Sequence, residues 1–177
     1  MIFEEKTIKK ETIYEGKIPN LRCDIVQAVG GEATREVIEH NGAVAMVALT
    51  ADGKVIMEKQ YRYPMRKVIL EIPAGKIDKG ETDPDEAAVR ELKEETGYTA
   101  GRMEKLGKIY PSVGYSEEGI NLYLCRDLVP GETDMDEDEA IEIEEYDFDE
   151  ACRMAESGEI RDAKTVCALL MARARMR

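Results

Sequence analysis

Three carboxylates crowd one short stretch of this sequence, R-E-L-K-E-E-T-G at residues 90–97. On a helix, Glu91, Glu94 and Glu95 would point within one narrow sector, where like charges a turn apart repel by roughly 0.2–0.5 kcal/mol. Arg90 can pair with Glu94, which leaves Glu91 and Glu95 without a cation. Such oxygen ligands suit a hard divalent cation, because Mg²⁺ binds one or two carboxylates together with waters and phosphate oxygens. A solvated surface helix would have the same composition, so the helix alone leaves both interpretations open.

The residues around this stretch mark the ends of a helix. Asp83 can cap the N-terminus, Pro84 suits the first turn, and Gly97 suits the position just beyond the C-terminus. The sequence therefore predicts a helix over residues 84–96. One side of this helix is predicted to be apolar, and it carries Ala88, Val89 and Leu92.

Several kinds of site are excluded by what the sequence lacks. Gly75 and Gly80 have a spacing similar to the start of a phosphate-binding P-loop, but Glu81 follows where that motif needs lysine. With a single histidine, His40, the chain has no H-E-x-x-H motif, and a histidine-dependent nucleophile would depend on one residue in a polar turn. The four cysteines lie far apart without a C-x-x-C pair, so we expect reduced thiols rather than disulfides or a zinc site.

The charge balance limits the possible binding partners. The chain has 38 acidic and 25 basic side chains and a formal net charge of -13, so its field repels nucleic acid and anionic membrane surfaces. An anionic substrate would need cations as intermediaries. The N-terminal residues are charged, and the longest apolar stretch, G-A-V-A-M-V-A-L, is too short to span a bilayer. We therefore expect a soluble cytoplasmic protein with no nucleic-acid or membrane partner.

The chain is rich in strand patterns up to about residue 73, and helices follow later. Hairpin turns are predicted at Gly30–Gly31, Asn41–Gly42 and Asp52–Gly53. The predicted strands cover residues 21–29, 32–40, 42–50, 54–61, 67–72, 102–110, 120–128 and 140–148, and two further helices cover residues 149–158 and 161–177. We predict a small β domain over residues 1–40 and an α/β domain over residues 41–177, in which helices cover the faces of a mixed sheet.

The loop and the glutamate helix together resemble the Nudix box, Gly-x5-Glu-x7-Arg-Glu-U-x-Glu-Glu-x-Gly-U, in which U is apolar. The matching positions are Gly75, Glu81, Arg90, Glu91, Leu92, Glu94, Glu95, Gly97 and Tyr98. Eight residues separate Glu81 from Arg90 where the motif has seven, and we expect the loop before the helix cap to absorb the extra residue. The resemblance favours the cation-binding interpretation over a plain surface helix.

Nearly the whole chain is similar to the ADP-ribose pyrophosphatase branch of the Nudix hydrolases. The similarity lies in T-R-E-V-I-E-H-N-G-A-V-A, K-Q-Y-R, E-I-P-A-G-K, Y-P-S-V-G-Y-S-E-E, the acidic D-E-D-E segment and D-A-K-T. It implies an α/β/α sandwich around a mixed sheet, with a small N-terminal antiparallel β domain that is exchanged across a homodimer. It also implies Mg²⁺-dependent hydrolysis of ADP-ribose, or a related nucleoside diphosphate sugar, to AMP and ribose 5-phosphate, with Mn²⁺ as a possible substitute.

The resemblance assigns roles to individual residues. The implied metal ligands are Glu91, Glu95, Glu139 and the carbonyl of Ala74, which would hold two or three Mg²⁺ ions. The implied catalytic residues are Glu137 as general base, with Glu94 and Arg90 in support. The implied substrate contacts are Arg35 and Glu36 at the adenine end, Arg62 and Glu118 nearer the diphosphate and ribose, and Gly114.

The acidic segment at residues 133–142 has competing interpretations. It is the only other carboxylate cluster after the box, which makes it a candidate source of the general base. Asp134, Asp136, Asp138 and Glu145 also have the spacing of a calcium loop, but Glu139 stands where such a loop needs glycine. A merely solubilising loop is a third interpretation. If this segment lies outside the active site, Glu118 is the next candidate for the base.

Three functions remain open from the sequence. The first is a pyrophosphatase for ADP-ribose or a related nucleoside diphosphate sugar. The second keeps the fold and hydrolyses another nucleoside di- or triphosphate derivative. The third is a non-catalytic nucleotide-sensing or cation-binding domain, because function depends on the site rather than on the fold. The complete set of glutamates favours an enzyme over this third function.

Overall fold

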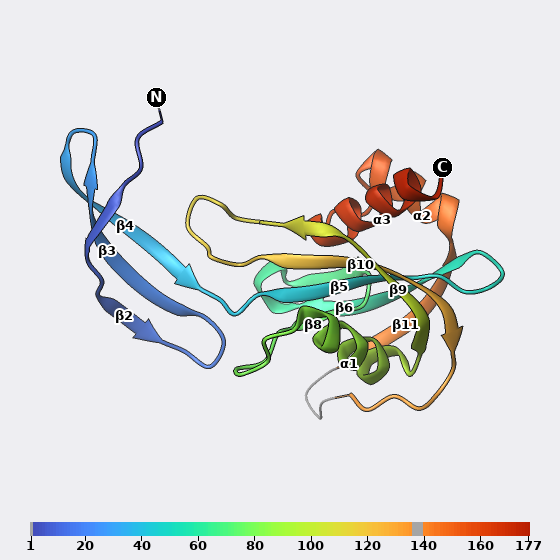
Figure 1. The fold of residues 1–177 in the computed structure, drawn as a ribbon. Coiled ribbons are helices and arrows are strands. Elements are labelled where there is room, and N and C mark those ends of the chain that lie inside the picture. The colour runs from blue at the N-terminus through green and yellow to red at the C-terminus, as the bar shows by residue number, and fades with distance from the viewer. Residues whose placement is uncertain (1, 136–139) are drawn as a thin grey trace. The chain divides into compact units, whose positions relative to one another are not determined.

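The structure, a computed structural model, describes residues 2–135 and 140–177 (Figure 1). The chain forms two compact units, which are described separately. The first unit contains the residues up to Gly42 together with Tyr110–Gly119. The second contains Ala43–Ile109 and Ile120–Arg177. The division into domains over residues 1–40 and 41–177 stays a prediction.

The first unit is built on one antiparallel sheet. Its strands are β1 (Lys6–Lys9), β2 (Thr12–Glu15), β3 (Asn20–Ala28) and β4 (Gly31–Glu39). β3 pairs with the other three, and its pairing with β4 runs along its whole length. Gly31 closes the β3–β4 hairpin with a φ of 119°, a conformation that favours glycine. Among the described residues of this unit, Val26 is the only buried apolar side chain, so the unit has almost no hydrophobic core of its own.

The second unit contains two sheets. A mixed sheet has the strand order β8-β5-β10-β9, in which β10 runs parallel to β5 and the other neighbours are antiparallel. Its strands are β5 (Ala43–Ala48), β8 (Ala74–Lys76), β9 (Thr99–Ile109) and β10 (Ile120–Val129). An antiparallel sheet has the order β11-β6-β7. It consists of β6 (Lys54–Arg62), β7 (Lys67–Glu71) and β11 (Ile141–Asp147), and a 3-10 turn at Tyr63–Met65 joins β6 to β7.

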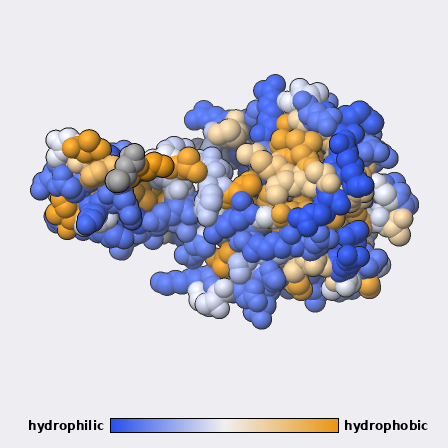
Figure 2. All heavy atoms as spheres, turned by 45° about the horizontal axis from the view of Figure 1, so that its top comes forward, coloured by the Kyte–Doolittle hydropathy of each residue, from blue (hydrophilic) through white to orange (hydrophobic). Residues whose placement is uncertain are grey.

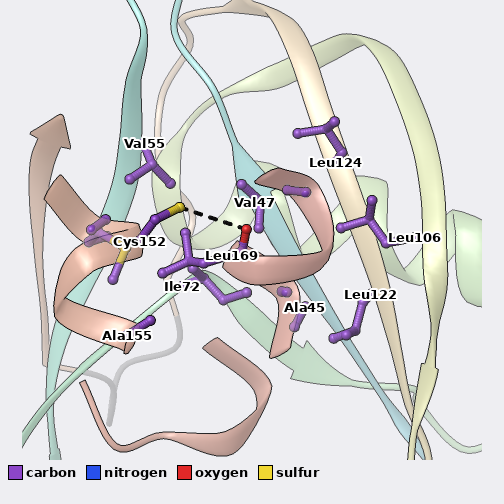
Figure 3. Close-up of a cluster of buried hydrophobic side chains, with 14 of the residues drawn as sticks. Ala45, Val47, Val55, Ile72, Leu106, Leu122, Leu124, Cys152, Ala155 and Leu169 are labelled. Atoms are coloured by element: carbon purple, nitrogen blue, oxygen red, sulfur yellow. Dashed lines mark hydrogen bonds between the residues drawn. The ribbon is translucent and has the colours of Figure 1, made fainter. Parts of the chain in front are cut away.

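Helices cover both faces of the sheets in the second unit. α1 (Pro84–Thr96) lies on one side, and α2 (Phe148–Ser157) and α3 (Ala163–Met176) lie on the other (Figure 1). β5 is buried along its whole length, and its side chains alternate between two clusters. Ala45 and Val47 join the cluster beneath α2 and α3 (Figure 3), whereas Val44 and Met46 join the one beneath α1. This arrangement confirms the predicted α/β/α sandwich around a mixed sheet.

The element predictions can be compared directly with the structure. Every predicted strand and helix is present, and α1 has the predicted bounds. The hairpin predicted at Asn41–Gly42 is wrong, because β4 pairs with β3 whereas β5 pairs with β8 and β10. The short strands β1, β2 and β8 were not predicted individually. All four cysteines are free thiols, as expected. The Cys152 thiol donates to the Leu169 carbonyl at 3.8 Å, between α2 and α3 (Figure 3). Among the described helices, none combines the length and apolarity needed to cross a membrane.

Candidate active site

The capped ends and the buried side of α1 determine how its three glutamates are oriented. Asp83 caps the helix by accepting from the N–H of Asp85 at 2.9 Å, and Gly97 ends it with a φ of 74°. The buried side of the helix consists of Ala87, Ala88, Leu92, Glu95 and Thr96. Val89 was predicted on the apolar side, but it is exposed. The glutamates therefore differ in burial, because Glu95 belongs to the buried side of the helix and Glu94 is only half-buried.

Arg90 connects the carboxylates of the candidate site. Its guanidinium donates to Glu91 at 2.9 Å, to Glu94 at 2.8 Å and to both oxygens of Glu81 at 3.0 and 3.1 Å. The prediction that Arg90 pairs with Glu94 is confirmed. The prediction that Glu91 lacks a cation is wrong, because the guanidinium spans both carboxylates. Hydrogen bonds to Glu81 and the charge of Glu91 raise the pKa of Arg90 further, so it remains a cation.

Glu81 contacts Arg90 even though one extra residue separates the two in the sequence. Its Oε2 accepts from the N–H of Asp78 at 2.7 Å, which closes a turn, and both oxygens face Arg90. Hydrogen bonds from Arg90 lower the pKa of Glu81. The helix begins at Pro84 behind its Asp83 cap, so Thr82 alone separates Glu81 from the cap. That the loop before the cap absorbs the extra residue stays a prediction.

Ala74 and Gly75, the first two residues of β8, lie directly against the glutamates. The backbone N–H of Ala74 donates to Glu95 Oε2 at 2.9 Å. A Cβ on Gly75 would lie 1.9 Å from the Glu91 carboxyl carbon, far inside any permitted contact. The absence of a side chain at Gly75 therefore creates the space that Glu91 fills. Pairing with β5 holds these two residues in place, with Gly75 opposite Val44 and Ala74 opposite Ala45.

Two buried carboxylates that the sequence analysis missed lie beside this site. Glu58 of β6 is opposite Glu71 of β7, and both residues are 3% exposed. Burial and the charge of Glu71 raise the pKa of Glu58 to about 8, and its carboxyl group also interacts with Glu95. Burial would raise the pKa of Glu71 too, but hydrogen bonds from Arg62 and the charge of Lys164 outweigh it and lower the pKa. A glutamate inside the apolar strand K-V-I-M-E-K-Q-Y was the available signal for Glu58.

The donor atoms near α1 suit a hard divalent cation, because they are carboxylate and backbone oxygens. Within residues 2–135 and 140–177, no three Asp, Glu, His or Cys side chains are grouped so that they could hold a metal ion. A cation beside Glu91 and Glu95 would therefore also need backbone oxygen, water or phosphate ligands, which is the usual mixture for Mg²⁺. The close approach of Glu91 to Gly75 and the hydrogen bond between Ala74 and Glu95 bring both carboxylates beside the backbone of β8, which is compatible with such a ligand set.

The predicted substrate contacts are divided between the two units. Arg62 belongs to the second unit, where its guanidinium binds both oxygens of Glu71 at 2.7 and 2.9 Å. The first unit contains Arg35, Glu36, Gly114 and Glu118. Within that unit Arg35 forms an ion pair with Glu5.

A buried arginine fixes the segment that carries Gly114 and Glu118. Arg22 of β3 forms ion pairs with Asp24 at 2.9 Å, Glu39 at 2.6 Å and Glu117 at 2.6 Å. The backbone of Ile38 adds two hydrogen bonds, to Tyr115 at 2.7 Å and from Glu117 at 3.0 Å. Segment 110–119 is therefore held against β3 and β4 by its own unit.

The predicted residues Glu137 and Glu139 lie outside the described residues. On their N-terminal flank, the N–H of Asp134 donates to the Glu94 carbonyl at 2.9 Å. Gly97 and Gly131 also approach so closely that a Cβ on Gly97 would lie 2.8 Å from the Gly131 carbonyl oxygen. Residues 131–134 thus lie against the C-terminal end of α1. Glu145, the last position of the calcium-loop spacing, lies in β11 and pairs with Lys54 at 3.0 Å.

Comparisons with known proteins agree with this geometry. The model of the NUDIX domain matches residues 39–169. The chain is 44% identical to the ADP-ribose pyrophosphatase of Bacillus subtilis, over 94% of this chain and 91% of that protein. It is also 44% identical to the methanol dehydrogenase activator of Bacillus methanolicus, over 95% and 92%. A solved structure described as an ADP compounds hydrolase matches with a TM-score of 0.86 and 24% identity, over 99% and 96%, which supports the fold.

Proposed function

This chain belongs to the Nudix family of hydrolases, and on that premise we propose that it hydrolyses ADP-ribose or a closely related nucleoside diphosphate sugar. The observation that carries the proposal is the Arg90-centred group of glutamates, held by α1 against Ala74 and Gly75 of β8. The relative named ADP-ribose pyrophosphatase, similar over most of both chains, supports the choice of substrate. The products would be AMP and ribose 5-phosphate.

The metal ligands in this proposal are Glu91, Glu95 and the carbonyl of Ala74, joined by Glu139. They would hold two or three Mg²⁺ ions, with Mn²⁺ as a substitute. When bound, such ions offset the charge of the diphosphate and lower the pKa of a bound water. The chain needs this help because its own net charge is -13, which repels an anionic substrate. The hydrogen bond from Ala74 to Glu95 supports the assignment, because it brings two of the proposed ligand residues together.

Arg90 and Glu94 act by orienting the other groups in this proposal. Arg90 binds Glu81, Glu91 and Glu94 at 2.8–3.1 Å, so it limits the rotamers of all three carboxylates. Fixed carboxylates reduce the reorganisation that ligand binding would otherwise require. Glu94 anchors Arg90 from the same helix, and its carbonyl holds Asp134 at the start of the acidic segment.

The reaction requires a base that accepts a proton from the attacking water. The water oxygen forms a bond to phosphorus, the bond from that phosphorus to the bridging oxygen breaks, and the bridging oxygen leaves on the other phosphate. We assign the base to Glu137, and the contact between Asp134 and Glu94 supports this assignment because it brings the flank of the acidic segment to α1. Arg35, Glu36, Arg62, Gly114 and Glu118 are the proposed substrate contacts.

The proposal also includes the assembly and the compartment. We propose a homodimer in which the first unit of one chain helps to close the substrate site of the other. The nearly coreless first unit supports this, because a small sheet without a core needs further apolar contacts to be stable. The four free cysteines support the reducing cytoplasm as the compartment.

A panel of phosphoanhydrides tests the proposed activity. ADP-ribose, other nucleoside diphosphate sugars, nucleoside triphosphates and dinucleotides would be incubated with the protein and Mg²⁺, and the products resolved by chromatography. We expect the highest kcat/KM for ADP-ribose, with AMP and ribose 5-phosphate in equal amounts. A preference for a triphosphate or another diphosphate would keep the fold assignment and overturn the substrate. Nucleotide binding without any hydrolysis would favour a non-catalytic domain.

A further inference from the structure

The start of α3 has no role in the proposed function, although the residues of its D-A-K-T sequence form several hydrogen bonds and ion pairs. Asp162 caps the helix: its Oδ2 accepts from the Thr165 N–H at 3.0 Å and from the Thr165 hydroxyl at 2.6 Å. The Thr165 side chain is fully buried. A helix cap needs only the aspartate and a backbone N–H, so capping alone does not explain the buried Thr165 hydroxyl.

The Thr165 hydroxyl also reaches the segment that leads into the candidate site. Its oxygen accepts from the backbone N–H of Ile72 at 3.0 Å. Ile72 lies in the gap between β7, which ends at Glu71, and β8, which begins at Ala74. A threonine hydroxyl can donate one hydrogen bond while it accepts another. The Thr165 hydroxyl makes both hydrogen bonds, so it connects the start of α3 to the backbone between β7 and β8.

Lys164 anchors the residue just before the gap. Its ammonium group forms ion pairs with Glu71 and, at 3.1 Å, with Asp162. The Lys164 side chain is 11% exposed and that of Glu71 is 4% exposed. Arg62 binds the same Glu71 carboxylate through two hydrogen bonds. Removing one member of a buried ion pair leaves an uncompensated charge, so Lys164 and Arg62 together fix the end of β7.

The anchored residues are close in sequence to the proposed metal ligands. Pro73 follows Ile72, and its carbonyl accepts from the N–H of Met46 at 2.9 Å. Ala74 comes next and donates to Glu95 at 2.9 Å. Consecutive Cα atoms are about 3.8 Å apart and proline restricts φ, so little slack separates Ile72 from Ala74. A shift at Ile72 would therefore move the contact between Ala74 and Glu95.

We propose that Lys164 and Thr165 are positioning residues for the active site. They hold Glu71 and Ile72 so that Ala74 meets Glu95 and its carbonyl stays available to a cation. The inference rests on the proposed function, because that function makes Ala74 and Glu95 metal ligands. Lys164 and Thr165 contact neither substrate nor metal in this role and act through the backbone of residues 71–74.

The test compares the parent chain with Thr165→Val, Thr165→Ser and Lys164→Met. Arg173→Met is the matched control, because Arg173 is a cation on the same helix whose ion pair at 2.7 Å is with Glu156. Three properties are measured: hydrogen exchange at the Ala74 amide without metal, Mn²⁺ affinity by electron paramagnetic resonance, and kcat and KM for ADP-ribose. Circular dichroism checks folding, and if Lys164→Met does not fold, the Val and Ser variants of Thr165 decide the question.

We expect Thr165→Val and Lys164→Met to speed exchange at Ala74 and to weaken Mn²⁺ binding roughly 10-fold or more, as loss of outer contacts around a metal site does. kcat should fall more than KM rises, and Thr165→Ser should restore most of each property. If Thr165→Val and Lys164→Met match Arg173→Met in exchange and in Mn²⁺ affinity, the inference is overturned. A parent chain that binds no Mn²⁺ would overturn the proposed function instead, and the two failures are distinguishable because exchange is measured without metal.

Discussion

The carboxylates of α1 have different hydrogen-bond partners, and Arg90 is the main source of this difference. It binds Glu91 and Glu94 but not Glu95, whose Oε2 accepts from a backbone N–H instead. Chemically identical side chains within two helical turns therefore have different surroundings. Glu95 also lies beside Glu58, so a second carboxyl group influences the site from the sheet.

The first prediction concerns Glu58, whose pKa is raised to about 8 by burial and by Glu71. The folded chain keeps a proton that the unfolded chain releases, so the contribution of Glu58 to stability is present below the unfolded pKa near 4.5 and is lost as pH rises toward 8. Between pH 5 and pH 8, the free energy of unfolding should fall relative to Glu58→Gln by at most about 1.4 kcal/mol per pH unit. Urea unfolding with a chelator present measures this. The exposed Glu4→Gln is the control, and parallel profiles for the parent and Glu58→Gln would contradict the prediction.

The second prediction separates Glu137 from Glu139. A base acts only in the transition state, so Glu137→Gln should lower kcat roughly 10²–10⁴-fold and leave the Mg²⁺ dependence nearly unchanged. Glu139→Gln should instead shift the Mg²⁺ titration to higher concentration. Steady-state kinetics at several Mg²⁺ concentrations distinguish the two effects. Parent rates in both variants would place the base elsewhere, with Glu118 examined next.

At residue level, the sequence predicted the pair of Arg90 and Glu94 but missed several other contacts. The spacing of the glutamates and Arg90 placed them together on one helix, because helical periodicity positions such residues reliably. It did not reveal that Arg90 also binds Glu91, since that contact depends on one rotamer of a long side chain. Glu58 and Glu71 were missed because strand pairing brings them together across residues 58–71, and no local pattern specifies that register.

At the scale of elements, the site depends on how closely β8 approaches α1. β8 has only three residues, Ala74–Lys76, yet it pairs with β5 and supplies both the amide that binds Glu95 and the glycine beside Glu91. From the sequence this segment is expected to be a loop, because three residues are too few for strand alternation to be visible. α1 was predicted with correct bounds because its caps, Asp83 and Gly97, act locally.

The third prediction follows from this close approach. Gly75→Ala would place a Cβ 1.9 Å from the Glu91 carboxyl carbon, so Glu91 or the backbone of β8 must move. Because small misplacements at a catalytic site can cost about 10²-fold, we expect kcat/KM for ADP-ribose to fall by that order. Gly30→Ala is the control, since no atom lies within 4 Å of the added Cβ. Equal activity in the two variants would show that Glu91 needs no such space.

At the scale of the whole molecule, the two units differ in how they are stabilised. The second unit contains two apolar clusters, whereas the first has a single buried apolar side chain among its described residues. The first unit instead exposes apolar side chains, and Figure 2 shows apolar surface on it. The exposed apolar side chains of this unit include Phe3, Ile8, Ile13, Tyr14, Ile18 and Val29. Exposed apolar surface on this scale is typical of protein–protein contacts.

The fourth prediction is therefore a homodimer that depends on the first unit. Light scattering at micromolar concentration should give twice the chain mass of 19.9 kDa. The double substitution Ile8→Glu and Ile13→Glu, which places charge on exposed strand positions, should shift the chain toward the monomer and reduce activity. Glu32→Lys, a charge change at an exposed position of β4, is the control. A fully active monomer would refute the exchanged arrangement.

The fifth prediction tests the central claim, that the glutamates of α1 bind the divalent cation on which hydrolysis depends. The measurement is the rate of AMP release from ADP-ribose as a function of Mg²⁺ concentration, for the parent chain and for Glu95→Gln. We expect no activity in excess chelator and recovery with Mg²⁺ or Mn²⁺. Glu95→Gln should retain the parent circular dichroism spectrum while its turnover falls on the order of 10²-fold or more, because a catalytic metal supplies several kcal/mol of transition-state stabilisation. Full activity in chelator, or in Glu95→Gln, would contradict the claim.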